Sequence, residues 1–278
     1  MNSLIWRLGI LVVCASMTLN AQEVGVAAAS DLQFVFKEVA ARFEQQTGNP
    51  VKLSFGSSGN FFSQIQNGAP YDLFFSADVE YPQKLEAEGL TEPGTLQQYA
   101  KGKLVLWTAT DSGLDVSRGL NILLEPTVKK IAVANPAHAP YGRAAVAALK
   151  AAGVYDKIAD KLIYGENISQ TAQFVASGNA QAGILALSLA VSPMMKSQGT
   201  YFVIPEDSYP RLDQVGVVLK SSKQKEIAEC FMDFIKSPEI TVLMKGYGFE
   251  LADTSVLAGK MPMQKSCICC GRRKPLAH

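Results

Sequence analysis

Residues 23–36 read EVGVAAASDLQFVF, and they contain an apolar run, a turn of small residues and the start of a helix. From Leu32 to Phe43, apolar side chains recur at steps of three and four residues, which is typical of one face of an amphipathic helix. The stretch therefore predicts a strand, a tight turn and a helix with Ser30 or Asp31 at its N-cap. Because a helix start presents unpaired N–H groups and the positive end of the helix dipole, it can hold an anion without any Lys or Arg.

The same arrangement recurs three more times along the chain. Each copy has a short apolar strand, a turn of small residues and a helical pattern, and the three turns are FGSSGN (55–60), NPAHAPYG (135–142) and GENIS (165–169). A single turn of this kind is usually an ordinary capped helix, but four of them form a pattern. In open α/β sheets, ligands bind outside the carboxyl ends of the strands, so these turns are the predicted binding elements.

The spacing of the turns divides the chain into two lobes. Two turns precede the strand-like segment KLVLWTA and two follow it, and strands alternate with helices throughout. This pattern predicts an α/β protein in which each lobe is a mostly parallel sheet flanked by helices. We assign residues 22–103 and 219–258 to lobe 1 and residues 104–218 to lobe 2, with hinges near residues 104–107 and 215–218.

The chain begins with a segment that is typical of a secretory signal peptide. Residues 1–21 carry one charge, Arg7, followed by an apolar core and then by small and polar residues, which predicts cleavage after Ala21. The apolar core is too short to span a bilayer. A lipid-anchored Cys14 is the alternative, although the bulky Val13 stands where such cleavage sites have a small residue. We expect the mature protein to be exported and soluble.

The chain ends in a basic tail. Residues 259–278 contain five Lys and Arg, no Asp or Glu, and three cysteines, Cys267, Cys269 and Cys270. We expect this tail to be disordered, since it follows a complete helical pattern. Its cysteines and His278 are soft metal ligands, but their spacing is not that of a zinc finger. The two remaining cysteines lie far from the tail and from each other, so no disulfide framework is predicted.

Between these ends the chain is acidic. Residues 22–258 hold 20 Lys and Arg against 25 Asp and Glu, a net charge of −5. A nucleic-acid-binding protein would present a basic face, so that class is excluded. The net charge also does not attract an anion, so a bound anion depends on local dipoles such as helix starts.

Six segments, in chain order, resemble those of the periplasmic molybdate-binding proteins of ABC importers. They are AAASDL, FGSSGN, GAPYDLFFSAD, NPAHAPYG, PEDSYP and KGYGFEL, and the similarity runs through nearly all of residues 22–252. The resemblance implies a two-lobed, type II periplasmic-binding-protein fold with an oxyanion held between the lobes. It also implies a periplasmic monomer that binds molybdate or tungstate, has no cofactor and delivers its ligand to the membrane permease of an ABC importer.

The resemblance also assigns an anion site, one turn at a time. The first turn places Ser30 on the anion through its hydroxyl and N–H, with the N–H of Asp31 beside it. The second turn places Ser58 there, again through hydroxyl and N–H, and the third and fourth contribute the backbone N–H groups of Tyr141 and Ile168. These residues would contact the oxygens of molybdate, so they are not ligands of a bare metal ion.

The chain departs from part of this family at one position. Some members carry a tyrosine in the strand near residue 186, where its hydroxyl contacts the anion, whereas this chain has Ala186. Other members carry a tyrosine in the third turn, as Tyr141 stands here. Whether Tyr141 contacts the anion through its N–H or its hydroxyl is left open.

A binding site that contains hydrogen-bond donors and no acceptors suits a fully ionised tetrahedral dianion. A protonated anion would meet N–H groups and no acceptor, so phosphate is disfavoured near neutral pH. Sulfate has the same charge and shape but is smaller, so a cage sized for molybdate gives it longer and weaker hydrogen bonds. Molybdate and tungstate are nearly equal in size, and the sequence does not separate them.

Three charged or titratable residues near the turns require an interpretation. The carboxylate of Asp31 would repel a dianion, so we expect it to face solvent or cap the helix; otherwise it marks a site for a cationic ligand. The alternative function is a binding protein for another oxyanion or for a metal cation. We expect His138 to be structural or solvated rather than a ligand. Arg143 is close enough to Tyr141 to reach an anion, but we expect it to be solvated in the first turn of its helix.

A serine-dependent hydrolase is the enzymatic alternative. Ser30, Ser57 and Ser58 are possible nucleophiles, with His138 as the candidate base. The sequence has no G-x-S-x-G motif, which hydrolases with a strained nucleophile turn carry. We therefore expect a binding protein that catalyses no reaction.

Overall fold

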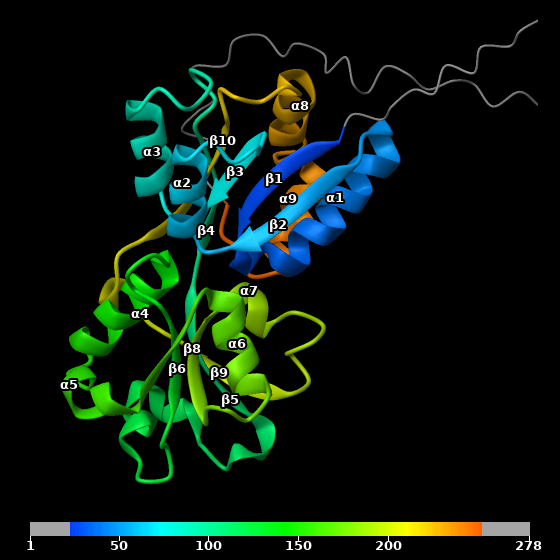
Figure 1. Ribbon diagram of the computed structural model, residues 1–278. Helices are drawn as coiled ribbons and strands as arrows, with labels where there is room; N and C mark the ends of the chain where they lie inside the picture. The colour runs from blue at the N-terminus through cyan, green and yellow to red at the C-terminus, as the bar shows by residue number, and fades with distance from the viewer. Residues whose placement is uncertain (1–22, 252–278) are drawn as a thin grey trace, which may run out of the picture.

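The computed structural model describes residues 23–251, which form two α/β lobes stacked one above the other (Figure 1). The signal peptide predicted for residues 1–21, the alternative anchor at Cys14 and the tail predicted for residues 259–278 lie outside this range. Each lobe has one five-stranded sheet with helices packed around it. The predicted α/β class and two-lobed architecture are confirmed.

The first lobe is built on a sheet with the strand order β2-β1-β3-β10-β4. Its strands are β1 (Val24–Ala29), β2 (Val51–Gly56), β3 (Leu73–Ser76), β4 (Gln97–Gly102) and β10 (Leu212–Val218). Its helices are the short 3₁₀ helix η1 (Ser30–Leu32), α1 (Gln33–Thr47), α2 (Ser58–Gln66), α3 (Glu80–Ala87), α8 (Lys225–Ile235) and α9 (Pro238–Gly246). Helices α2 and α3 lie on one side of the sheet, and α1, α8 and α9 lie on the other (Figure 1).

The second lobe is built on a sheet with the strand order β7-β6-β8-β5-β9. Its strands are β5 (Leu104–Ala109), β6 (Ile131–Ala134), β7 (Leu162–Gly165), β8 (Ala182–Ala186) and β9 (Gly199–Val203). Its α-helices are α4 (Pro140–Ala151), α5 (Tyr155–Ile158), α6 (Ile168–Ala176) and α7 (Leu187–Ala190). The 3₁₀ helices η2 (Thr110–Ser112), η3 (Val116–Leu124) and η4 (Ala159–Lys161) complete it, and η5 (Glu206–Ser208) follows β9.

One strand in each sheet runs against the other four. In the first sheet, β1 is parallel to β2 and β3, whereas β10 is antiparallel to β3 and β4. In the second sheet, β6 is parallel to β7 and β8, whereas β5 is antiparallel to β8 and β9. Because parallel neighbours are joined by helical crossovers, their carboxyl ends share one edge of the sheet, and the next helices begin there.

The chain crosses between the lobes at two places. Lys103 alone links β4 to β5, and residues 204–211 link β9 to β10. The prediction that placed residues 212–218 in lobe 2, with a hinge at residues 215–218, is wrong because β10 pairs with β3 and β4 of the first sheet. An apolar run indicates a buried strand, but it does not say which of two sheets buries that strand.

Alternate side chains of the first sheet enter two separate cores. Val26 of β1 packs with α1, α8 and α9, whereas the next residue, Ala27, packs with α2 and α3. Phe75 and Phe74 of β3 divide in the same way, as strand geometry requires. The ring of Phe75 meets Phe36 of α1 edge to face, with centroids 4.9 Å apart. These contacts anchor α1 and therefore the turn that precedes it.

Candidate functional site

The four helix starts predicted as binding elements lie at the junction of the two lobes. In the first lobe, Ala29 at the end of β1 pairs with Gly56 at the end of β2, and the arrowheads of both strands point toward the second lobe (Figure 1). In the second lobe, Ala134 at the end of β6 pairs with Gly165 at the end of β7. The turns that follow are therefore neighbours within each lobe.

Hydrogen bonds join these turns from one lobe to the other. The N–H of Ser169, in the first turn of α6, donates to the Oγ of Ser30 over 3.3 Å. The N–H of Gly59, in the first turn of α2, donates to the carbonyl oxygen of His138 over 2.9 Å. The structure therefore has the two lobes closed on each other.

The two hydroxyls predicted to hold the anion are buried at this junction. Ser30 begins η1 and is 2% exposed, and Ser58 begins α2 and is fully buried. The Oγ of Ser30 accepts the N–H of Ser169, and the Oγ of Ser58 accepts the N–H of Ala77 over 3.0 Å. Since a hydroxyl accepts and donates at once, each of these groups keeps its own proton to offer to a ligand.

Helix capping at the junction differs from the prediction. The N-cap positions of η1 and α1 are Ala29 and Leu32, with no side-chain cap, so the predicted cap at Ser30 or Asp31 is wrong. Helix α2 is capped by Ser57, whose Oγ accepts an N–H of the first turn over 3.3 Å. The adjacent hydroxyl of Ser58 is therefore not needed for capping.

Tyr141 and Ile168 stand at the starts of the two helices of the second lobe. Tyr141 follows Pro140, the first residue of α4, and Ile168 is the first residue of α6, which Asn167 caps. Both residues are buried, with 2% and 3% exposure. The first N–H groups of a helix have no acceptor within that helix. Both positions are therefore suited to present a backbone donor at the junction.

The side chain of Asp31 points into the protein. The residue is 1% exposed, and its Oδ2 accepts hydrogen bonds from the hydroxyl of Tyr141 (3.1 Å) and from Nε2 of Gln214 (2.5 Å). Its Oδ1 has no partner among the described residues. The prediction that this carboxylate faces solvent or caps a helix is wrong, because Tyr141 of the second lobe and Gln214 of β10 supply donors to it in the interior.

Burial controls the charge of the Asp31 carboxylate. It raises the pKa of Asp31 from 3.8 to about 6, although the hydrogen bonds from Gln214 and Tyr141 act in the opposite direction. Burial also raises the pKa of Tyr141 well above its ordinary value, so the tyrosine hydroxyl stays protonated and donates to the carboxylate. Near neutral pH the Asp31 carboxylate is therefore largely ionised, and a second anion placed beside it would raise the pKa of Asp31 further.

Comparison with known proteins identifies the family in which this arrangement occurs. The model of the bacterial extracellular solute-binding proteins matches residues 24–250. The chain belongs to this family. It is 41% identical to the molybdate-binding protein ModA of Azotobacter vinelandii over 241 residues, which cover 87% of this chain and 94% of that protein. It is 37% identical to ModA of Rhodobacter capsulatus over 239 residues, which cover 86% and 92% of the two chains.

A solved structure resembles this solute-binding protein over both lobes. The periplasmic molybdate-binding protein of Azotobacter vinelandii matches it with a TM-score of 0.79 and 35% sequence identity. The match covers 83% of this chain and all of that one. The relatives are thus solute-binding proteins rather than enzymes.

Several polar residues that surround Asp31 in this solute-binding protein were not predicted from the sequence. Gln214 is fully buried; its amide also donates to the hydroxyl of Tyr141 (3.2 Å), and its Oε1 accepts from the hydroxyl of Tyr99 (2.7 Å). Ser188 of the second lobe donates to the carbonyl oxygen of Asp31 over 2.8 Å. A glutamine inside the apolar run LDQVGVV was the available signal, because buried polar groups need partners.

Ser57, His138 and Glu166 form a row of polar side chains that crosses the junction. The Oγ of Ser57 lies 2.8 Å from Nδ1 of His138, and Nε2 of His138 lies 3.5 Å from Oε1 of Glu166. The hydrolase alternative requires such a serine–histidine pair. The Ser57 oxygen, however, also caps α2, and the residue is 4% exposed. His138 is thus a structural contact between the lobes.

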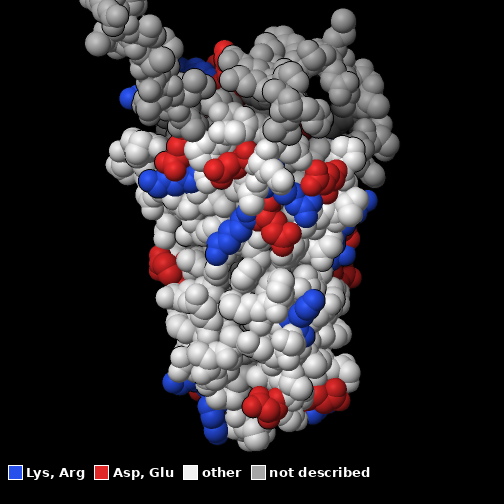
Figure 2. Space-filling view, turned by 90° about the vertical axis from the view of Figure 1, so that its right-hand side faces the viewer, with Lys and Arg blue, Asp and Glu red and all other residues white. Residues whose placement is uncertain are grey.

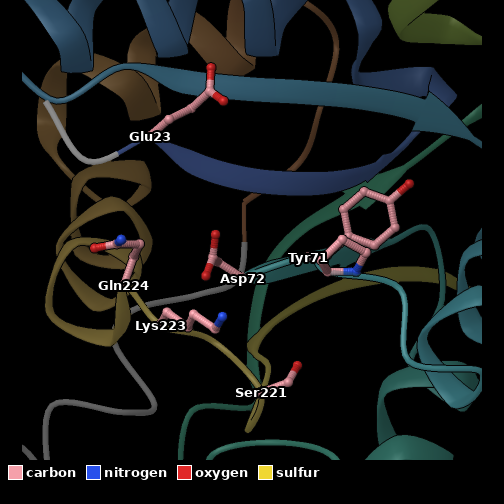
Figure 3. A pocket seen from close by; sticks show the side chains of 7 residues that line it. Glu23, Tyr71, Asp72, Ser221, Lys223 and Gln224 are labelled. Atoms are coloured by element: carbon pink, nitrogen blue, oxygen red, sulfur yellow. The ribbon is translucent and has the colours of Figure 1, made fainter. Parts of the chain in front are cut away.

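A small pocket in the first lobe lies at the opposite end of the sheet from the junction. It has a volume of about 240 Å³, and Glu23, Asp72 and Lys223 are among the residues that line it (Figure 3). The carboxylate of Asp72 already accepts the N–H of Gly25 (2.8 Å) and the hydroxyl of Ser222 (2.7 Å). Because this pocket lies where β1 and β3 begin, it does not match the carboxyl-end location of ligand sites in such sheets.

A larger groove runs between α9 and the segment that follows α7. Its volume is about 620 Å³, and its lining includes Val191, Pro193, Val242 and Leu243. Figure 2 shows this side of the molecule, where charged side chains gather over the upper half and few lie in the middle. Arg42 also lines the groove, but it pairs with Glu239 over 2.8 Å, and most of the other lining residues are apolar. The groove therefore offers few free donors to an anion and is not the candidate anion site.

The described residues contain neither a cluster of metal ligands nor a membrane-spanning helix. Between residues 23 and 251, no group of three or more His, Cys, Asp or Glu side chains is placed to hold a metal ion. Over the same range, no helix combines the length and the apolar character needed to cross a membrane. The described part of the chain therefore gives no support to the alternative of a metal-cation site.

Proposed function

We propose that this protein captures molybdate, and tungstate with it, and delivers the anion to the membrane permease of an ABC importer. The observation that carries the proposal is the pair of buried hydroxyls of Ser30 and Ser58, each with a proton to donate, where four helix starts meet. The two ModA relatives, at 41% and 37% identity, support the same ligand.

The proposed site supplies neutral donors to a doubly charged ligand. The donors are the hydroxyls of Ser30 and Ser58 and the N–H groups at Ser30, Asp31, Ser58, Tyr141 and Ile168. A hydrogen bond to a charged oxygen contributes about 1.5–3 kcal/mol net. About seven such bonds support a Kd on the order of nanomolar after the cost of closing the lobes.

Asp31 makes phosphate an important competitor to test. A site with donors and no acceptors would disfavour protonated phosphate. The structure, however, places a buried carboxylate at the junction, and its Oδ1 has no partner among the described residues. We therefore propose that the size of the donor cage, rather than a lack of acceptors, selects molybdate over the smaller anions sulfate and phosphate.

The cellular setting is part of the same proposal. The signal peptide exports the protein to the periplasm, where it acts as a monomer with no resident cofactor and no catalytic activity. The periplasmic protein of Azotobacter vinelandii, similar over both lobes, supports this location.

For the hydrolase alternative, the Ser57–His138 contact is the observation in favour, and the test is a turnover assay with generic esters. We expect no hydrolysis above that of a Ser57→Ala variant.

A thermal-shift panel tests the ligand. The mature protein is melted with molybdate, tungstate, sulfate, phosphate and Ca²⁺, and we expect large shifts with the first two only. At about 1,000 times Kd, a ligand that binds the native state stabilises it by about 4 kcal/mol, or roughly 10 °C for a chain of this size. A large shift with phosphate, sulfate or Ca²⁺ and none with molybdate would contradict the proposal.

Ser58 provides the matched variant for this panel. Ser58→Ala removes a buried hydroxyl donor, so we expect it to shrink the molybdate shift. It also leaves the N–H of Ala77 without its acceptor, so the unliganded protein should melt a few degrees lower, and each shift is measured from the variant's own unliganded melt. Ser63→Ala, on the exposed side of the same helix, is the control and should keep the full shift. Equal molybdate-induced shifts in melting temperature for the two variants would show that Ser58 does not contact the anion.

A further inference from the structure

Arg143 binds the two lobes together beside the proposed anion site. It lies in the first turn of α4, where its Nη1 donates to the hydroxyl of Tyr81 (3.1 Å) and its Nη2 donates to Oδ2 of Asp78 (2.5 Å). Oε2 of Glu80 lies 3.5 Å from Nη2, and the guanidinium carbon lies 5.3 Å from the centroid of the Tyr81 ring. These partners all belong to the first lobe, so the prediction of a solvated arginine is wrong.

The first lobe holds the acceptor of this ion pair in place. Oδ1 of Asp78 accepts the hydroxyl of Ser76 (2.9 Å) and the N–H of Tyr81 (3.3 Å), and the Asp78 side chain is 12% exposed. Asp78 directly follows Ala77, whose N–H is bound by the hydroxyl oxygen of Ser58. The acceptor is therefore part of the same rigid segment that positions Ser58.

The second lobe holds the donor in a matching position. Arg143 and Tyr141 lie in the same turn of α4, so the guanidinium and the Tyr141 backbone move together. The ion pair with Asp78 forms only when the start of α4 approaches the segment before α3. The same approach brings Tyr141 toward Ser58, so the ion pair reports on closure of the site.

We propose that Arg143 is a positioning residue that holds the lobes closed over the bound anion and thereby slows its release. This inference rests on the proposed function, because it assigns a role in that same site. The guanidinium is engaged by Asp78, Tyr81 and Glu80, and it acts on closure rather than on the anion. A cation that attracted the anion would instead speed association, and salt would screen that effect.

The test measures the rates of molybdate binding and release by stopped-flow intrinsic fluorescence. Arg143→Gln keeps the approximate size of the side chain but removes the charge, and we expect release to become about tenfold faster while association changes less than about twofold. Arg143→Lys keeps the charge but lacks the planar fork, so it should fall between the wild type and Arg143→Gln. Arg118→Gln is the matched control, because Arg118 pairs with Glu125 inside the second lobe.

Small-angle X-ray scattering of the unliganded proteins separates the outcomes. Arg143→Gln should have a larger radius of gyration than the wild type and Arg118→Gln. Unchanged release and an unchanged radius of gyration would overturn the inference, as would a salt-dependent loss of association with normal release. If the wild type does not bind molybdate, the proposed function fails, and the assignment of Arg143 to molybdate release fails with it. If the wild type binds molybdate and Arg143→Gln has the wild-type release rate and radius of gyration, the inference about Arg143 fails while the proposed function stands.

Discussion

Asp31 places a buried carboxylate where a dianion is proposed to bind. Asp31 accepts hydrogen bonds from Tyr141 and Gln214, and burial raises its pKa to about 6. The residue therefore has two opposed effects near neutral pH. Its hydrogen bond to Tyr141 joins the lobes, whereas its charge disfavours a second negative charge nearby.

The elevated pKa predicts how Asp31 affects stability. The unfolded chain loses this proton near pH 4 and the folded protein near pH 6, so the free energy of unfolding falls as pH rises between these values. Above pH 6 the loss is complete, at about 3 kcal/mol for a change in pKa from 3.8 to about 6. Asp31→Asn lacks this term but keeps an acceptor for Tyr141, so its stability relative to the wild type should increase from pH 4 to pH 7.

Denaturant unfolding at a series of pH values checks this prediction. The quantity of interest is the difference between Asp31→Asn and the wild type, because other titrating groups cancel in it. Asp111→Asn, at an exposed position, is the control and should show no pH-dependent difference. A constant difference for Asp31→Asn across pH 4–7 would mean that the carboxylate is not buried as described.

At the scale of residues, the sequence indicated which hydroxyls lie at the junction better than it indicated how the neighbouring side chains are oriented. Ser30 and Ser58 could be selected because each lies in a turn of small residues between a strand and a helix. The orientation of Asp31 could not, because it depends on Gln214, which is 183 positions away in the chain. Local rules of helix capping favoured a role for Asp31 that the distant amide and the tyrosine of the other lobe outweigh.

The start of α2 is in close contact with the second lobe. A Cβ at Gly59 would lie 2.5 Å from the hydroxyl of Tyr81 and 2.6 Å from the carbonyl oxygen of His138. The second contact is with backbone of the other lobe, which cannot move aside without opening the junction. A glycine at this position therefore permits the close approach of the two helix starts.

Gly59→Ala should prevent full closure. Because the added methyl group meets His138 only when the lobes are together, we expect molybdate affinity to fall at least about tenfold, by calorimetry. The methyl group also crowds the hydroxyl of Tyr81 in the first lobe, so the unliganded protein should melt a few degrees lower. Gly246→Ala, where a Cβ meets nothing within 4 Å, is the control. Normal affinity in Gly59→Ala would show that binding does not require this approach.

The elements themselves were largely predictable, because their periodicity is local. The four strand–turn–helix units around Ser30, Ser58, Tyr141 and Ile168 appear where the small-residue turns indicated. Two features were not predictable from a local pattern. Strand β4 has the polar sequence QQYAKG, which does not look buried, and β10 gave no indication of the sheet that it joins. Both strands are defined by pairing with each other across 110 or more residues of sequence.

At the scale of the whole molecule, the two lobes are joined at both of their sides. Near the crossings, Lys103 of the first linking segment lies 3.2 Å from Glu206 of the second, and these two residues also pair with Glu250 and Lys101 of the first lobe, respectively. At the junction of the helix starts, the contacts are those of Asp31 with Tyr141 and of Ser30 with Ser169. The first set accompanies the covalent links and the second set forms only on closure, so an anion at the junction would stabilise the closed form.

The central claim is that a doubly negative oxyanion is held at this junction by uncharged donors. Anomalous diffraction at the molybdenum absorption edge, on crystals grown with molybdate, tests it most directly. We predict one strong peak between the hydroxyls of Ser30 and Ser58, within hydrogen-bonding distance, through its oxygens, of the N–H groups of Tyr141 and Ile168. A peak only elsewhere, or no peak at a saturating molybdate concentration, would contradict the claim.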